Sequence, residues 1–116
     1  MKNKLSDRLE DFAVEVIKLG GKLQRTFVGR HIGGQLVRSA TSAGANYEEA
    51  CGAESRSDFI HKLQIVLKEL RESLYWLRLA SRSGLLSEDD TTSLLKEGKE
   101  LSNIVAKSVV TAKKNR

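Results

Sequence analysis

Side chains able to do acid–base or metal chemistry recur at helical spacing in the middle of the chain. The set is Arg38, Ser42, Asn46, Glu49, Asp58 and Glu72. Paired carboxylates of this kind can serve general acid–base catalysis or bind a metal ion. An arginine among acids and amides is also the usual composition of a buried polar network, which fixes the register between helices. We interpret the set as structural and expect no catalytic residue.

No other combination of residues indicates a metal, a cofactor or a nucleophile. Two histidines and one cysteine are too few for a zinc site, and Cys51 is expected to be a small buried residue. The pairs Gly20-Gly21 and Gly33-Gly34 have no preceding strand and no following G-K-[ST], so they do not make a phosphate loop. We therefore predict a non-enzymatic protein that uses no cofactor and no metal.

A second pattern suits phosphate binding. Cations and one tyrosine step by three and four residues along one side of an expected helix: Lys68, Arg71, Tyr75, Arg78 and Arg82. Cations about one turn apart can track phosphates, and the tyrosine can stack on an unpaired base. The alternative is an ordinary solvated face, with Arg71 and Arg78 bridging to acids of the last helix. The net charge of +5 permits a nucleic-acid partner without requiring one.

Four segments of helical periodicity must position these residues. The composition, with no proline and few aromatics, favours helix over sheet. Within one domain spanning 1–116, we expect helices at about 7–24, 28–53, 56–82 and 88–112. Ser6, Ser55 and Ser87 are the expected N-caps, and Ser83-Gly84 is the expected end of the third helix. Short connections predict an all-α, antiparallel up-down-up-down four-helix bundle.

The second and third segments carry more packing surface than one bundle core uses. Bulky residues of the third segment fall outside its apolar arc, and the second has a stripe of small residues opposite its core face. Helix-interior glycines cost about 1 kcal/mol each relative to alanine, so close approach of another helix is expected to offset that cost. We predict a homo-oligomer; the alternative is loose packing within one chain, with a surface tryptophan. The expected interface residues are Gly34, Thr41, Ala45, Gly52, Ile65, Trp76 and Leu79.

The chain shows no signal for export or for a membrane. The stretch MKNKLSDRLEDF is charged and lacks the apolar region of a signal peptide. No apolar run approaches the roughly 20 residues needed to cross a bilayer. A lone cysteine suits a reducing compartment, so we expect a cytoplasmic protein.

Residues 29–79 carry a combination of motifs that resembles a known family. The motifs are RSATS-x-GAN-Y-EEA, ESRSDFIHKL and KELRESLYWL. They resemble those of the 23S rRNA intervening-sequence proteins, and with the flanking helices the resemblance covers nearly the whole chain. It implies a left-handed bundle that assembles as a homopentameric ring in the bacterial cytoplasm. It implies no established activity and leaves the function unknown.

Together with the basic stripe, the resemblance leads us to expect an RNA or ribonucleoprotein partner. The alternative is a protein-interaction scaffold or accessory subunit that docks an acidic protein without touching nucleic acid.

Overall fold

The computed structural model describes residues 4–115, and in this part of the chain it contains helices and no strand. The all-α prediction is therefore confirmed for these residues; of the expected domain 1–116, residues 1–3 and 116 lie outside the described part. The elements are α1 (Lys4–Gly20), the 3-10 helix η1 (Gly21–Leu23), α2 (Phe27–Cys51), α3 (Arg56–Arg82) and α4 (Glu88–Lys114).

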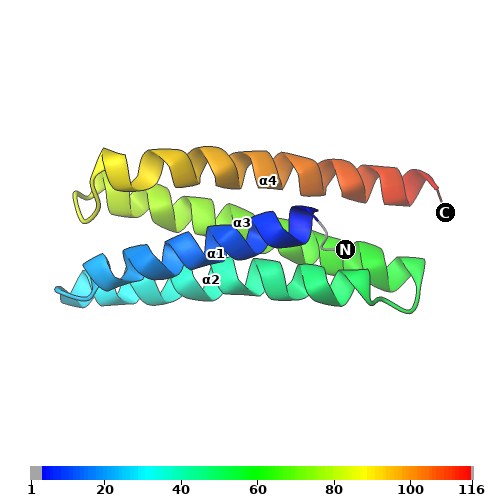
Figure 1. Ribbon diagram of the computed structural model, residues 1–116, viewed down its shortest axis with the longest axis horizontal. Coiled ribbons are helices and arrows are strands. Elements are labelled where there is room, and N and C mark those ends of the chain that lie inside the picture. Colours follow the sequence, from blue (N-terminus) through cyan, green and yellow to red (C-terminus); the bar gives the residue numbers. More distant parts are fainter. Residues whose placement is uncertain (1–3, 116) are drawn as a thin grey trace.

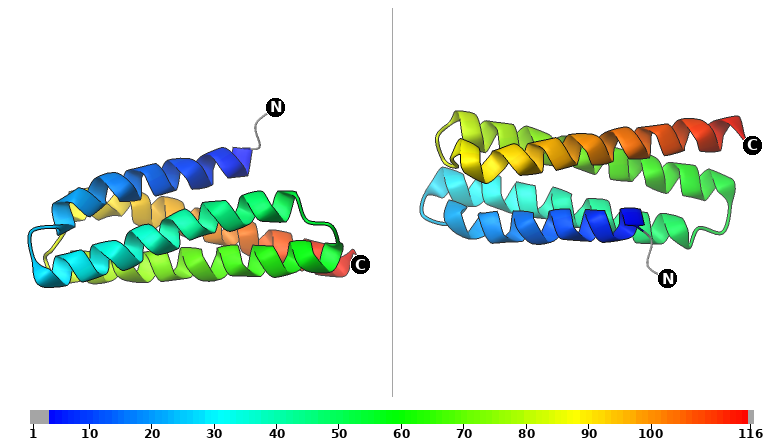
Figure 2. Two further views of the ribbon diagram at one scale, coloured as in Figure 1. Left: turned by 90° about the horizontal axis from the view of Figure 1, so that it is seen from below. Right: turned by 45° about the horizontal axis from the view of Figure 1, so that its top comes forward.

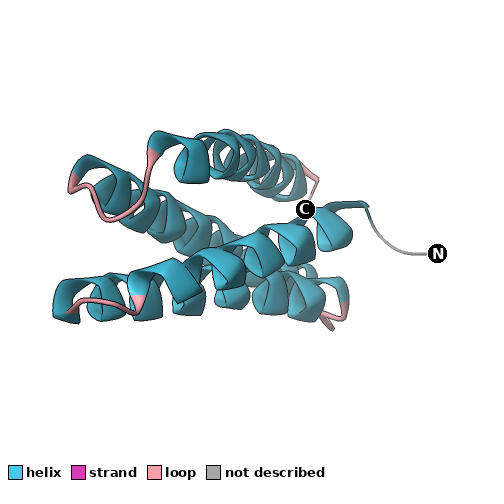
Figure 3. Ribbon diagram, turned by 60° about the vertical axis from the view of Figure 1, so that its left-hand side comes forward, coloured by secondary structure: helices cyan, strands magenta, loops and turns pink. Residues whose placement is uncertain are grey.

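The four long helices lie side by side along a body measuring 47 × 25 × 19 Å (Figure 1). The connections α1–α2 and α3–α4 lie at one end, and the connection α2–α3 lies at the other. Each helix packs against two neighbours: α2 and α4 each contact both α1 and α3. Only short loops join the helices (Figure 3).

Side-chain caps fix where the helices begin. Ser55 and Ser87 accept hydrogen bonds from the backbone N–H groups of Asp58 at 3.0 Å and Asp90 at 3.1 Å, which confirms both predicted N-caps. The prediction for Ser6 is wrong, because α1 already contains Lys4 and the Ser6 hydroxyl instead contacts the carboxylate of Glu48. Before α2, Thr26 caps the helix by accepting from the N–H of Gly29 at 2.9 Å.

The predicted end of the third helix is confirmed at Gly84. Its φ of 78° lies in the left-handed region, where a side chain would be strained. The turn lets the N–H groups of Leu85 and Leu86 donate to the carbonyl of Ala80, which satisfies part of the helix end. This turn sends the chain back along the bundle into α4.

The core follows the apolar seams of the four helices. Leu9, Leu36, Leu70 and Leu101, one from each helix, are fully buried. Burying a side chain of this size contributes roughly 1.5–3 kcal/mol. Gly98 lets three helices approach closely, because a Cβ there would lie 2.7 Å from Leu74 Cδ2 of α3 and 3.2 Å from the Phe12 ring of α1.

One end of the bundle is covered by fewer helices than the rest. α1 has 17 residues and α4 has 27, so α1 stops before the end that α2, α3 and α4 reach (Figure 2). A hollow of about 900 Å³ lies there, lined by Phe59, Ile104 and Ala112 among others. Cys51 also lines it and is exposed, so the expectation of a buried cysteine is wrong, because α1 does not extend far enough to cover it.

In the described residues, no helix combines the length and the apolar character that crossing a membrane requires.

Candidate nucleic-acid interface

Five side chains of α3 form one solvent-facing surface, which we call the α3 basic face. All five are exposed, and the cations at its ends are about 21 Å apart along the helix axis. A helix places residues three and four apart on the same side, so a single rigid element holds the whole set. Its members are Lys68, Arg71, Tyr75, Arg78 and Arg82.

The cations of this face carry charge that no acid of the described chain neutralises by a salt bridge. Arg71 and Arg78 do not bridge to α4, so the predicted alternative of ion pairs with the last helix is not realised in residues 4–115. The charge of Lys68 helps to lower the pKa of Glu72, which lies one turn away.

Some cations on other surfaces are paired with acids. Arg8 of α1 donates to Glu97 at 2.7 Å and to Glu100 at 2.9 Å, both on α4. Lys22 bonds Asp90 at 2.7 Å, and this contact is the main reason that the pKa of Asp90 lies below its usual value. These pairs hold α1 and η1 against α4, whereas the α3 basic face remains available to an external anion.

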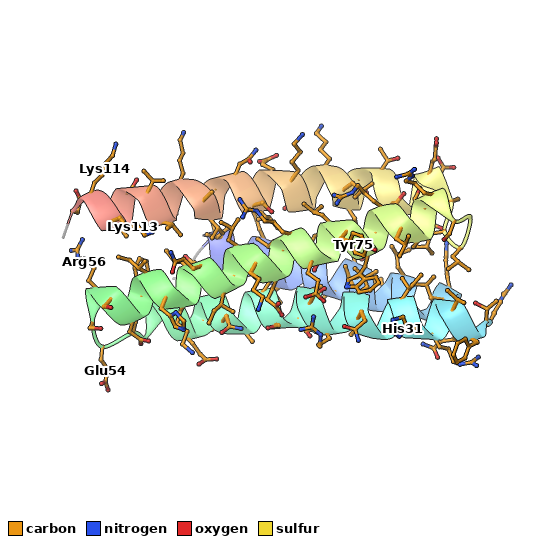
Figure 4. All side chains as sticks on the ribbon, turned by 180° about the vertical axis from the view of Figure 1, so that it is seen from behind. His31, Glu54, Arg56, Tyr75, Lys113 and Lys114 are labelled. Atoms are coloured by element: carbon orange, nitrogen blue, oxygen red, sulfur yellow. The ribbon has the colours of Figure 1, made fainter. Side chains whose placement is uncertain are left out.

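Tyr75 is the aromatic member of the face and is 50% exposed. Its ring meets that of Trp76 edge to face, with the centroids 5.0 Å apart and the planes at 72°. Trp76 in turn meets His31 of α2 at 5.9 Å and 88°. Figure 4 shows Tyr75 on α3 and His31 on α2 toward the same end of the bundle. Aromatic packing thus ties the exposed tyrosine to the neighbouring helix.

A cluster of Arg38, Glu69 and Glu72 holds the Trp76 side chain in place. The indole N–H donates to Glu72 Oε2 at 3.0 Å, and the Arg38 guanidinium of α2 donates to Glu72 and, at 2.9 Å, to Glu69. The hydrogen bond from Trp76 and that from Arg38 lower the pKa of Glu72, and the contact with Glu72 raises the pKa of Arg38. These shifts favour the charged forms of Arg38 and Glu72, and the cluster links α2 to α3.

The polar network predicted from sequence is divided into separate groups. Asn46 donates to Ser42 within α2, at 2.9 Å to its carbonyl, and Glu49 accepts from Lys62 of α3 at 3.0 Å. Asp58 does not belong with Glu72, because 14 residues of α3 separate them by about 21 Å. Of the predicted set, Asn46 meets Ser42 within α2, and Arg38 meets Glu72 across the α2–α3 contact.

Sequence reasoning omitted the most buried member of this cluster. Glu69 is only 6% exposed and accepts from Arg38. The sequence feature that could have identified Glu69 is its position three residues before Glu72, which places it on the same side of the helix, facing Arg38. Lys62 and His31 were likewise omitted as partners of Glu49 and Trp76, because their pairing depends on the alignment of two helices.

The residues predicted to form an oligomer interface lie on two different surfaces of the chain. Those on α3 are half-buried, and two of them, Trp76 and Leu79, pack against the core. Trp76 therefore has an intramolecular partner in His31, where the sequence led us to expect an open flank. Gly34, Thr41 and Ala45 of α2 and its C-cap residue Gly52 are all exposed, whereas Ile65 on α3 is partly covered.

The described residues contain no cluster of metal-ligating side chains. No three His, Cys, Asp or Glu side chains of residues 4–115 group together in a way that would hold a metal ion. Within the same part of the chain, every buried side-chain nitrogen and oxygen has a hydrogen-bond partner. The candidate site is therefore the exposed basic face of α3.

Comparisons with known proteins agree with this architecture. Residues 1–107 match the family model described as 23S rRNA-intervening sequence protein. A crystal structure from Bacteroides thetaiotaomicron, described as a protein with unknown function from the S23 ribosomal protein family, is 36% identical with a TM-score of 0.84. The match covers 90% of this chain and 97% of that one. No curated protein matches this chain.

Proposed function

Since the chain belongs to the family of 23S rRNA-intervening sequence proteins, we propose that it is a non-enzymatic, cytoplasmic protein that associates with RNA or a ribonucleoprotein through the α3 basic face. The observation that carries the proposal is that the cations of the α3 basic face are exposed and unpaired by acids within residues 4–115. Arg8, Lys22 and Arg38, by contrast, are held by acids. A row of free cations on a rigid helix suits a polyanion.

The mode of binding follows from the residue types. The face has arginine, lysine and tyrosine side chains, and it lies on the outside of the bundle. Contacts of this kind go mainly to phosphates, which position a nucleic acid without reading its sequence. Binding is therefore driven by charge, and any selectivity comes from the form of the RNA.

A fluorescence-anisotropy titration against RNA at several salt concentrations tests this function. Neutralising four phosphates of a single strand releases counterions, so we expect log K to fall with log salt with a slope of about −3. A control titration with an uncharged fluorescent dye excludes non-specific sticking. Absence of binding at low salt would contradict RNA association and favour an accessory subunit, whose acidic protein partner a pull-down would then identify.

Assembly is the second part of the proposal: copies of this left-handed, antiparallel bundle form a closed ring, for which five copies are expected from the family. The supporting observation is an exposed stripe along α2. Phe27, which is 79% exposed, lies one heptad before Gly34 and two before Thr41 on the same side of the helix. Beside this stripe α1 leaves Val14 and Ile17 exposed at 43% and 53%.

The two predicted surfaces differ from each other, which favours a contact between unlike surfaces. The small stripe of α2 in one copy would meet the Ile65, Trp76 and Leu79 flank of α3 in the next. A contact between unlike surfaces is heterologous, and its repetition closes a ring when the rotation allows. Sedimentation velocity at micromolar concentration tests this: five copies of the 12.9 kDa chain would sediment as about 65 kDa, and a 12.9 kDa species alone would contradict assembly.

A further inference from the structure

An open, shallow hollow lies on the last two turns of α3 and its C-cap, within the α3 basic face. Its volume is about 520 Å³. We call it the Tyr75 hollow. It is lined by Tyr75, Arg78, Leu79, Arg82 and Ser83.

The aromatic wall of the hollow is held in place before any ligand arrives. The Tyr75 ring contacts Trp76, whose indole N–H is fixed by Glu72 at 3.0 Å, and Glu72 is bound by Arg38 of the neighbouring helix. The ring is nevertheless 50% exposed, so it remains accessible to a planar ligand. A side chain fixed in advance loses little conformational entropy on binding.

The charged residues of the hollow, Arg78 and Arg82, suit the phosphates that flank a base in RNA. Arg78 and Arg82 lie about 4.5 Å and 10.5 Å along the axis from Tyr75, on the same side of the helix. Neither forms a salt bridge within residues 4–115. An arginine guanidinium can bind a phosphate through two parallel hydrogen bonds and can also stack on a flat ring. Aromatic, apolar and cationic groups therefore meet in one small space.

We propose that the Tyr75 hollow binds one unpaired nucleobase of RNA, stacked on Tyr75, with the adjacent phosphates held by Arg78 and Arg82. The inference rests on the proposed RNA function and gives it a substrate class, namely single-stranded RNA or an unpaired loop. In a duplex the bases stack on each other and do not reach a surface tyrosine, so the protein would contact only phosphates and sugars. The hollow thus favours single strands over duplexes.

Three ligands of matched length separate base stacking from charge. They are a labelled unstructured RNA strand of about 12 nucleotides, the same strand annealed to its complement, and an abasic strand that keeps the sugar–phosphate backbone. The wild-type protein should bind the unstructured strand about tenfold more tightly than the abasic strand, because one base stacks. The Tyr75→Leu variant should lose this difference while binding the abasic strand and the duplex as the wild type does. The matched Tyr75→Phe variant keeps the ring and should keep the difference.

The single tryptophan of the chain provides a second measurement. Because the rings of Trp76 and Tyr75 lie 5.0 Å apart, a base on Tyr75 should quench the Trp76 fluorescence, and the abasic strand should not. Sedimentation of each variant checks that the assembly is unchanged.

Equal wild-type affinity for the unstructured and abasic strands would overturn the proposal that a base binds in the Tyr75 hollow. So would tighter binding of the duplex than of the single strand, or an equal loss of all three ligands in Tyr75→Leu. In each of these cases RNA binding itself would stand. Failure of the wild type to bind any of the three ligands at low salt would reject the proposed function, and the hollow with it.

Discussion

Replacing Lys68, Arg71, Arg78 and Arg82 together by Glu will weaken RNA binding by more than about 100-fold at low salt. The replacements remove four cations and place four anions where phosphates would lie. Each one changes the charge by two units, so the net charge falls from +5 to −3. Lys, Arg and Glu have similar helix propensities and all four positions are exposed, so the fold should be retained. Anisotropy titration measures the affinity, and circular dichroism checks the helix content.

A control with the same net charge separates the face from the overall charge. It carries Glu at Arg25, Lys96, Lys107 and Lys114, which are exposed and form no salt bridge within residues 4–115. We expect this variant to bind RNA within a few-fold of the wild type. An equal loss in both variants would mean that RNA responds only to total charge. Loss of the oligomer in the first variant would mean that the α3 basic face is a subunit interface.

Gly29→Ala will destabilise the protein by about 2–3 kcal/mol, although alanine is the better helix former. A Cβ at Gly29 would lie 2.3 Å from the Leu23 carbonyl oxygen and 2.7 Å from Thr26 Oγ1. The carbonyl belongs to the backbone and cannot rotate away, so the turn between α1 and α2 must shift. That shift also strains the Thr26 cap, which is worth about 0.5–2 kcal/mol. Together these costs exceed the gain of about 1 kcal/mol in helix propensity.

The matched control is Gly34→Ala in the same helix. A Cβ at Gly34 meets no atom within 4 Å, so the chain should gain about 0.5–1 kcal/mol. Thermal unfolding at one fixed protein concentration compares the two variants, and we expect the Tm of Gly29→Ala to fall by about 10 °C. A stabilised Gly29→Ala variant would contradict the packing of this turn. If Gly34→Ala stabilises the fold and weakens the oligomer, another copy approaches this stripe closely.

These experiments test different parts of the molecule. The charge variants address the outer side of α3, and the glycine variants address the α1–α2 turn and the open side of α2. Trp76 connects RNA binding with assembly. Its ring contacts Tyr75, and it also belongs to the α3 flank proposed to meet the next copy. RNA affinity and sedimentation should therefore be measured together on every variant.

The amino-acid sequence by itself determined the features that depend on spacing along one helix. The caps at Ser55 and Ser87, the end of α3 at Gly84 and the exposure of the α3 basic face follow from local preferences and from the helical repeat. None of these requires knowledge of a neighbouring helix, and each could be predicted.

The tertiary structure decided which residues meet across helices. A shift of one residue between α2 and α3 moves a side chain by about 1.5 Å along the axis and 100° around it. The pattern therefore did not reveal that Arg38 reaches Glu69, that Trp76 meets His31, or that Asp58 lies far from Glu72. Gly29 and Gly34 both lie within the predicted second helix, Gly29 in its first turn. Only the α1–α2 turn, folded back against one and leaving the other open, separates them.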